Sequence, residues 1–271
     1  MYREFFGLKE KPFNITSDPN FLFLSRVHKE AFAHLLYGIN ERKGFLEITG
    51  EVGAGKTTLC RALLSQLDKK TKSAFIFNST LPELQLLQAI LEDYGITVTS
   101  RNKVSLLKQL NHFLIDELTH GNNVILIIDE AQNLKPSILE EIRMLSNLET
   151  DKEKLFQIIL VGQPELKVKL ASPCLKQLRQ RISVRFHITP LDKDEAADYI
   201  NHRLSVAGST GQTVFEPAAI EDIYNFSGGI PRLINMVCDK SMLTAYTMET
   251  RCITAHIVSR SIKEMEGHLP G

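Results

Sequence analysis

The sequence predicts an α/β protein in which a five-stranded parallel sheet covered by helices is followed by a small all-helical domain. Short apolar runs recur between longer segments whose apolar residues are spaced three and four apart. This alternation is typical of a parallel sheet covered by helices. After Pro190 the short runs stop, and helical patterns punctuated by Pro and Gly follow. We therefore expect an α/β domain over residues 1–191 and a helical domain over 192–271.

The individual elements follow from the same patterns. The predicted strands are residues 45–49, 74–78, 124–129, 156–162 and 184–189. The predicted helices are residues 56–67, 84–94, 104–118 and 137–148, followed by 192–206, 217–226, 231–247 and 254–266. Asp192 and Pro217 are natural helix starts, because acidic residues follow each of them closely.

The composition is that of a soluble globular protein. Of its 271 residues, 43% are hydrophobic and 24% are charged, which suffices for a large core. Lys and Arg together number 32, as do Asp and Glu, so the formal net charge is zero and no basic block points to nucleic acid. The four cysteines have no metal-ligand spacing, and we interpret them as reduced, mostly packed thiols.

Targeting and membrane signals are absent from the sequence. The N-terminus lacks the apolar stretch of a signal peptide, and the chain has no apolar run of roughly 18 residues. These features predict a cytoplasmic protein that associates with a membrane only through a partner.

Residues 50–57 read Gly-Glu-Val-Gly-Ala-Gly-Lys-Thr and match the phosphate-binding pattern GxxxxGK[ST]. The glycines allow a tight turn whose N–H groups face phosphates, and the following helix N-terminus adds positive partial charge. Lys56 is expected to contact the β and γ phosphates, and the Thr57 hydroxyl to coordinate Mg²⁺. A Gly-rich turn without a ligand is the alternative, which the strand before the motif and the helix after it disfavour. The nucleotide-binding residues are predicted to be Gly50, Glu51, Val52, Gly53, Ala54, Gly55, Lys56, Thr57 and Thr58.

The apolar run 124–129 ends in two carboxylates, Asp129 and Glu130. Such a run predicts a central strand, whose carboxyl end opens where ligands bind in α/β sheets. Asp129 is expected to hold Mg²⁺, and Glu130 to orient and deprotonate the attacking water. Two solvated acids at the start of a loop are the alternative, and the upstream phosphate loop favours the hydrolytic role. No guanine-reading NKxD sequence occurs, so ATP is the expected nucleotide.

With these motifs and Gly228-Gly229-Ile230-Pro231-Arg232, the chain resembles the AAA+ superfamily of P-loop ATPases. It is most similar to the general secretion pathway protein A family (ExeA/GspA), and within it to ATPases of MSHA pilus biogenesis. The resemblance covers nearly the whole chain. The matching segments are residues 2–8, Pro12-Phe13, Asp18-Pro19, Phe23-Leu24-Ser25 before His28, and 161–166.

The resemblance implies a strand order of 5-1-4-3-2 and roles for three further residues. Gln163 falls at the sensor 1 position, where its amide reaches the γ-phosphate or the attacking water. A polar turn residue is the alternative. Arg232 matches the sensor 2 arginine of the helical lid, with solvent or ion-pair exposure as the alternative. Arg181 is the preferred arginine finger for a neighbouring subunit, although Arg179 and Arg185 compete for that role and surface ion pairing explains any of the three equally well.

The family resemblance also implies that residues 1–28 pack beside the adenine. Aromatic and proline side chains would form the apolar wall of the base pocket, and one basic residue would lie near the ribose or base. Core packing explains the aromatic residues equally well. The residues concerned are Phe5, Phe6, Pro12 and Phe13 for the wall, and Arg26 or His28 for the basic residue.

The implied function is Mg-dependent hydrolysis of ATP to ADP, coupled to homo-oligomerisation, in a hexameric ring for example, and to assembly of a pilus or secretion apparatus at the bacterial inner membrane. The sequence ends at Gly271 without the transmembrane and periplasmic regions of longer members, which predicts a soluble ATPase or a truncated longer member. Two alternatives stay open. One is a DNA-acting transposition helper of the TniB kind, disfavoured by the zero net charge. The other is a nucleotide-gated scaffold with little turnover, disfavoured by Glu130.

Overall fold

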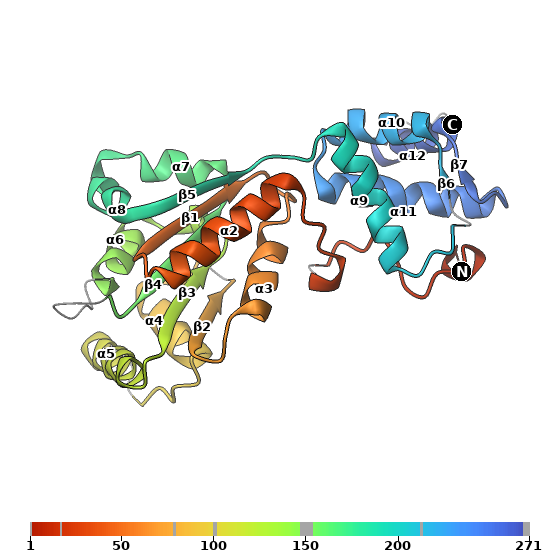
Figure 1. Ribbon diagram of the computed structural model, residues 1–271. Coiled ribbons are helices and arrows are strands. Elements are labelled where there is room, and N and C mark those ends of the chain that lie inside the picture. The colour runs from red at the N-terminus through yellow and green to blue at the C-terminus, as the bar shows by residue number, and fades with distance from the viewer. Residues whose placement is uncertain are drawn as a thin grey trace. The chain divides into compact units, whose positions relative to one another are not determined.

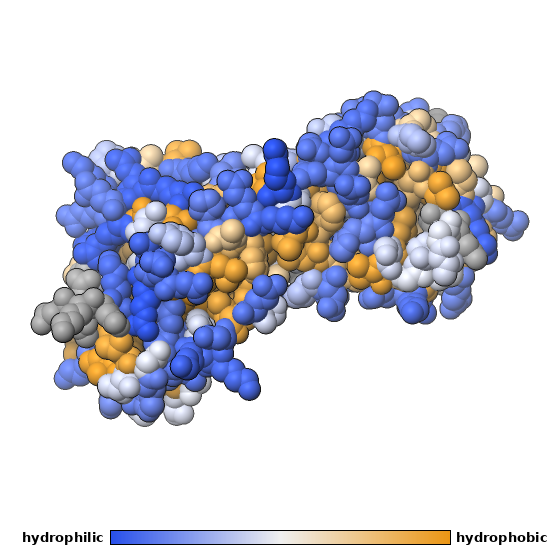
Figure 2. All heavy atoms as spheres, viewed as in Figure 1, coloured by the Kyte–Doolittle hydropathy of each residue, from blue (hydrophilic) through white to orange (hydrophobic). Residues whose placement is uncertain are grey.

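The computed structural model describes residues 2–16, 18–77, 80–99, 102–146, 154–211 and 214–267. The chain forms two compact units. The sheet unit consists of residues 27–50 and 59–188, and the helical unit consists of residues 1–26, 51–58 and 189–271. Hydrophilic residues cover most of the visible face of each unit (Figure 2). Among the described residues, no helix combines the length and apolarity needed to cross a membrane.

A five-stranded parallel sheet forms the centre of the sheet unit (Figure 1). Its strands lie in the order β2-β3-β4-β1-β5, which confirms the order implied by the resemblance. Every residue of β1 and β4 is buried, as expected for strands covered by helices on both faces. The strands are β1 (Phe45–Gly50), β2 (Thr71–Ile76), β3 (Asn123–Ile128), β4 (Gln157–Gly162) and β5 (Ile182–Ile188).

Helices connect these strands and bury their apolar sides against the sheet. The predicted helices are present, and α2, α7 and α8 are additional. Strand β2 begins three residues earlier than the predicted strand 74–78. The prediction missed Thr71, Lys72 and Ser73 because β2 is an edge strand and these residues are not apolar. Residues 78, 147 and 148 of the predicted elements lie outside the described residues. The helices are α2 (Arg26–Asn40), α3 (Lys56–Gln66), α4 (Glu83–Asp93), α5 (Lys103–Thr119), α6 (Pro136–Leu145), α7 (Pro164–Leu170) and α8 (Lys176–Arg181).

The helical unit contains the helices predicted after residue 191, together with the short N-terminal helix α1 (Tyr2–Phe5). Its prediction as all-helical omitted two short strands, β6 (Val214–Phe215) and β7 (Cys252–Ile253), which pair in parallel. A two-residue strand leaves no periodic pattern in a sequence, so only the fold reveals it. The remaining helices are α9 (Lys193–Val206), α10 (Pro217–Ser227), α11 (Pro231–Thr247) and α12 (Ala255–Met265).

The N-terminal segment packs into the core of the helical unit. Phe6 is fully buried there and Phe13 is 2% exposed. The Phe13 ring meets Phe215 edge-on at a centroid distance of 6.0 Å, and Phe5 meets Tyr246 at 5.5 Å. Core packing thus accounts for these aromatic residues within the helical unit.

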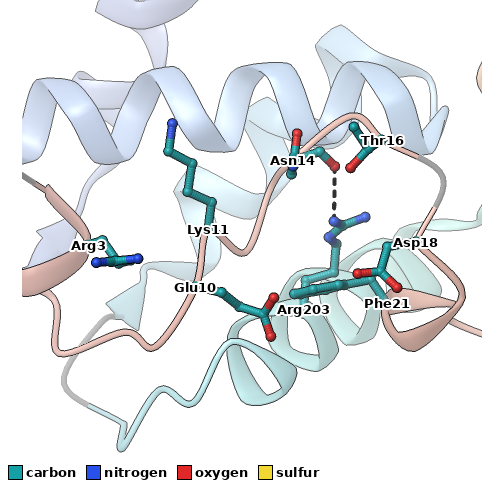
Figure 3. Close-up of a pocket in the computed structure, with 8 residues that line it drawn as sticks. All are labelled: Arg3, Glu10, Lys11, Asn14, Thr16, Asp18, Phe21 and Arg203. Atoms are coloured by element: carbon teal, nitrogen blue, oxygen red, sulfur yellow. Dashed lines mark hydrogen bonds between the residues drawn. The ribbon is translucent and has the colours of Figure 1, made fainter.

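Arg203 on α9 holds this segment in place (Figure 3). Its guanidinium donates hydrogen bonds to the carbonyls of Pro12 and Asn14, the second at 3.0 Å, and stacks 4.7 Å from the Phe21 ring centroid. The side chain is buried, so these contacts compensate for its lost hydration. A pocket of about 300 Å³ adjoins it, lined by Arg3, Glu10, Lys11, Asn14, Thr16, Asp18, Phe21 and Arg203.

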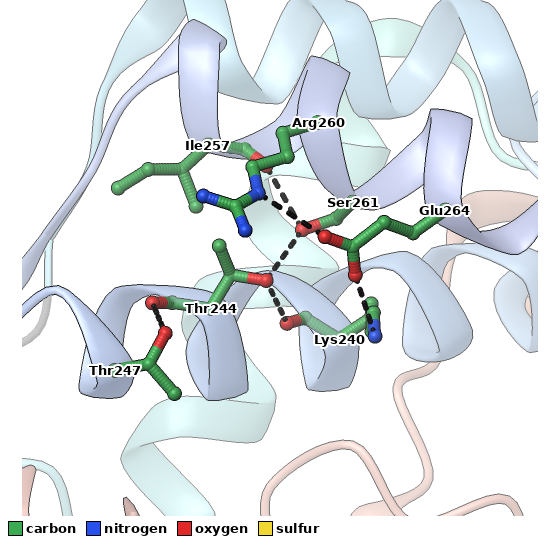
Figure 4. A network of polar contacts seen from close by, with 7 residues as sticks. All are labelled: Lys240, Thr244, Thr247, Ile257, Arg260, Ser261 and Glu264. Atoms are coloured by element: carbon green, nitrogen blue, oxygen red, sulfur yellow. Dashed lines mark hydrogen bonds and ion pairs between the residues drawn. The ribbon is translucent and has the colours of Figure 1, made fainter. Parts of the chain in front are cut away.

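Polar contacts join α11 to α12 (Figure 4). The hydroxyls of Thr244 and Ser261 lie 3.1 Å apart at a buried position of this interface. At its edge, Glu264 on α12 pairs with Lys240 on α11 at 2.7 Å and with Arg260 at 3.1 Å. These contacts fix the orientation of α11, the helix that carries Arg232 in its first turn.

One carboxyl group is buried inside the sheet unit. The Glu47 side chain on β1 is 4% exposed, and its Oε2 lies 3.4 Å from Arg185 Nε on β5. Burial raises the pKa of Glu47, and the charges of Arg185 and Lys167 act in the opposite direction. Because Arg185 stabilises only the ionised form of Glu47, the cost of losing Arg185 grows as pH rises and Glu47 ionises.

We expect Arg185→Ala to lower the free energy of unfolding by about 1–3 kcal/mol at pH 8, where the buried carboxylate is ionised and loses its partner. At pH 5 the loss should be smaller, because a larger fraction of Glu47 is protonated there than at pH 8. Urea unfolding at both pH values measures the difference. The double variant Glu47→Gln/Arg185→Ala should lose the same amount at either pH, and a pH-independent loss in the single variant would contradict this account.

Candidate functional site

The loop between β1 and α3 has the conformation that its glycines predict. Gly53 and Gly55 have φ values of 82° and 89°, which residues with a side chain rarely adopt. Lys56 opens α3, is only 5% exposed, and donates from Nζ to the Glu51 carbonyl at 2.8 Å. Its ammonium group therefore lies at the loop itself, where an anion bound by the loop N–H groups would meet it.

Within the helical unit, the start of α11 contacts this loop. The backbone N–H of Arg232 donates to the Gly53 carbonyl at 3.3 Å. A Cβ atom at residue 53 would lie 2.4 Å from Arg232 Cβ, so glycine is required for the approach as well as for the turn. The structure thus places Arg232, an exposed side chain, beside the phosphate-binding motif.

In the sheet unit, Asp129 and Glu130 follow directly on β3. Asp129 is 3% exposed, and its Oδ1 accepts a hydrogen bond from the Glu130 N–H at 2.9 Å. Glu130 itself has φ 53° and ψ 35°, in the left-handed region. For a residue with a side chain this conformation costs about 1–2 kcal/mol, and such strain is concentrated at functional sites.

The carboxylate of Glu130 is held by two amides. Its Oε2 accepts from Gln132 Nε2 at 2.5 Å and from Gln163 Nε2 at 3.0 Å. The side chain of Gln132 also accepts from the Gln163 backbone N–H, through Oε1 at 3.0 Å. The predicted site residue Gln163 therefore contacts the Glu130 carboxylate. Gln132 makes the same contact and is a residue of this site that the sequence analysis missed. Its position as the last residue of the Asp-Glu-Ala-Gln sequence was the available signal.

The register of the sheet explains why these side chains meet. Strands β3 and β4 pair in parallel with Ile128 opposite Leu160, so their carboxyl ends lie side by side. Gly162 at the end of β4 leaves the room that Gln132 occupies, because a Cβ atom there would lie 2.8 Å from Gln132 Oε1.

The three arginine candidates have different surroundings in the sheet unit. Arg185 is engaged with Glu47 and also donates to the carbonyl of Arg179. Arg181, the last residue of α8, is half-buried and donates from Nη1 to Ser146 Oγ at 3.0 Å. Arg179 is exposed. Arg185 is thus paired with a buried carboxylate, whereas Arg181 contacts a hydroxyl and Arg179 donates to the Ala171 carbonyl at 3.3 Å. Arg179 and Arg181 stay the candidates for a role between subunits.

The chemistry of the predicted ligands suits magnesium. A threonine hydroxyl at residue 57 and a carboxylate at residue 129 are hard oxygen donors, and Mg²⁺ in nucleotide sites takes one or two such groups together with phosphates and water. The described residues contain no cluster of three or more His, Cys, Asp or Glu side chains suited to a metal. At these two oxygen ligands the coordination of Mg²⁺ would be completed by phosphate oxygens and water.

Comparison with known proteins agrees with this geometry. Residues 39–170 match a family model described as an AAA domain. The chain is 43% identical over 268 residues to general secretion pathway protein A of Aeromonas hydrophila, which covers 98% of this chain and 49% of that protein. The chain is thus a homologue of that protein, carries an AAA domain, and spans about half of its relative's length.

Solved structures show the same fold. The ORC2 protein of Aeropyrum pernix has a TM-score of 0.73 at 18% identity and covers 94% of this chain and 72% of its own. The Cdc6p structure from Pyrobaculum aerophilum has a TM-score of 0.69 at 18% identity, with 90% and 70% covered. The predicted fold class and the resemblance to general secretion pathway protein A are confirmed, and the finer likeness to pilus biogenesis ATPases stays a prediction.

The left-handed backbone at Glu130 predicts an unusual order of stabilities. We expect Glu130→Gly to be more stable than Glu130→Ala by about 1 kcal/mol, since glycine adopts this conformation without the clash of a Cβ atom. Urea unfolding of the two variants tests this. As a control, the same pair at the exposed helical residue Lys108 should show the reverse order by a similar amount. Equal stabilities at residue 130 would mean that no backbone strain is stored there.

Proposed function

We propose that this homologue of general secretion pathway protein A binds Mg·ATP at residues 50–58 and hydrolyses it with Asp129 and Glu130. The observation that carries the proposal is the arrangement after β3, where Glu130 adopts a strained backbone and its carboxylate is held by two amides. A carboxylate fixed in this way suits a base that deprotonates water, because its orientation is set before the reaction.

The other residues have complementary roles in this proposal. Lys56 and the loop N–H groups bind the phosphates, and Thr57 and Asp129 supply the oxygen atoms for Mg²⁺. When bound, the metal neutralises charge on the phosphates. Glu130 takes the proton of the attacking water, and Gln163, which already contacts Glu130, orients that water. Products are ADP and phosphate.

Arg232 links the helical unit to the nucleotide in this proposal. Its backbone already bonds to Gly53, and its exposed guanidinium suits phosphate oxygens. Closure of the helical lid on ATP would then move α11 with the phosphates. The base itself would lie beside the N-terminal segment, where His28 is buried and the Arg26 N–H donates to Glu195 at 2.8 Å.

We further propose that the protein acts as an oligomer, such as a hexameric ring, in assembling a pilus or secretion apparatus, as a cytoplasmic ATPase recruited to the inner membrane by a partner. The support is the name of its homologue, general secretion pathway protein A, together with the resemblance of the sequence to ATPases of MSHA pilus biogenesis. In this role ATP binding favours assembly of the oligomer, and ATP hydrolysis favours its dissociation.

Two substitutions separate binding from hydrolysis. Lys56→Ala should weaken ATP binding roughly tenfold to hundredfold, because the phosphates lose a charge-assisted partner. Glu130→Gln should keep the affinity and lose hydrolysis by about 10² or more, since the amide keeps the shape without the base. Isothermal titration with Mg·ATP and steady-state phosphate release measure the two effects. Wild-type binding by folded Lys56→Ala, or wild-type turnover by Glu130→Gln, would refute the corresponding assignment.

An arginine supplied by a neighbouring subunit predicts complementation. Arg181→Ala should bind ATP normally and fail to hydrolyse it, because the charge that stabilises the transferring phosphoryl group is lost. Mixing Arg181→Ala with Lys56→Ala should restore activity, since one subunit then has an intact phosphate loop and the other an intact Arg181. The measurement is phosphate release against mixing ratio at a concentration where mixed oligomers form. Recovery with Arg179→Ala in place of Arg181→Ala would transfer the role to Arg179.

A further inference from the structure

We infer that Lys169, which lies far along the chain from the predicted phosphate-binding residues 50–58, is a positioning residue for hydrolysis. It acts on Glu130 through Gln132. The inference rests on the proposed function, because it assigns Lys169 a role in the reaction for which Glu130 is the base. It follows from a chain of contacts that leads from α7 to the carboxylate of Glu130.

The first contacts are made by the ammonium group of Lys169. Its Nζ donates hydrogen bonds to the carbonyls of Gln132 and Leu134, the second at 2.7 Å. These residues belong to the short 3-10 turn η2 (Ala131–Asn133) and its end, directly after Glu130. A half-buried cation that donates to two backbone carbonyls holds such a turn more firmly than neutral hydrogen bonds would.

The second contacts are made by the side chain of Gln132. Its Nε2 donates to the Glu130 carboxylate, and its Oε1 accepts from the Gln163 N–H. An ionised carboxylate can only accept and a backbone N–H can only donate, so the residue between them must do both. An amide side chain meets this requirement, which is why glutamine suits the position and alanine or glutamate does not.

Both sets of contacts lead back to the same helix. Helix α7 begins at Pro164, directly after Gln163, and Lys169 lies in its last turn. The helix therefore holds the main chain of Gln132 through Lys169 and its side chain through the Gln163 N–H. Two attachments on one rigid element fix the amide that orients Glu130, and the strained backbone of Glu130 leaves this carboxylate dependent on such support.

The experiment compares Lys169→Met with Lys167→Met. Both lysines lie on α7, but Lys167 is exposed and serves as the matched control. We expect Lys169→Met to lower kcat about 10-fold to 100-fold with KM for ATP within about twofold of wild type, because misplacing a catalytic group by an ångström costs that much. Lys169→Arg should restore most of the activity, since it supplies a cation of similar reach. An equal loss in Lys167→Met, or a KM that rises in step with the fall in kcat, would overturn the inference.

A double variant tests whether Lys169 acts through Gln132. Gln132→Ala/Lys169→Met should be no slower than Gln132→Ala alone, because Lys169 then has no amide left to position. If the two substitutions instead lower kcat by the product of their separate effects, Lys169 does not act through Gln132. Hydrogen exchange provides a readout without ATP: the N–H groups of Asn133 and Leu134, bonded to Glu130 and Ala131 at 2.9 and 3.1 Å, should exchange faster in Lys169→Met than in Lys167→Met.

The outcomes separate this inference from the proposed function. If wild type releases phosphate no faster than Lys56→Ala, the proposed ATPase fails, and the role of Lys169 in hydrolysis fails with it. If wild type hydrolyses ATP and Lys169→Met matches Lys167→Met in kcat, only the positioning role of Lys169 is wrong.

Discussion

The parallel pairing of β3 with β4 is the constraint on which the candidate site depends. With Ile128 opposite Leu160, the two strands end at the same level, and the residues after each strand must share one edge of the sheet. Glu130 and Gln163 are 33 positions apart in the chain, yet their side chains bond at 3.0 Å for this reason. A change of register by one residue would separate the carboxylate from the amide and turn every side chain of the shifted strand to the opposite face.

The contacts at this edge of the sheet also explain how a strained backbone persists at Glu130. The left-handed backbone of Glu130 is unfavourable by itself, and it persists because the surrounding contacts leave no alternative of lower energy. Asp129 binds its N–H, two amides bind its carboxylate, and Lys169 binds the turn that follows. Together these contacts hold the Glu130 carboxylate in one defined direction.

Packing within the helical unit likewise holds the phosphate loop, residues 51–58, in place. Residues 51–58 pack with this unit, and α11 approaches Gly53 closely enough that only glycine fits. The orientation of α11 depends in turn on its polar contacts with α12 and on the core that includes Phe6 and Phe13. Packing far from the loop therefore fixes the position of α11, and with it the position of Arg232 beside Gly53.

The local features of this protein could be predicted from its sequence alone. The glycines of residues 50–57 and the apolar run before Asp129 predicted the loop and the carboxylates without knowledge of the fold, because backbone conformation and strand burial leave periodic or motif-like patterns. The strand order came from family resemblance. Only the tertiary structure revealed the polar start of β2, the two-residue strands β6 and β7, and the contacts of Gln132 and Lys169. Those features arise from contacts between distant segments, and a hydrogen bond between two polar side chains on different elements has no periodicity that one sequence can display.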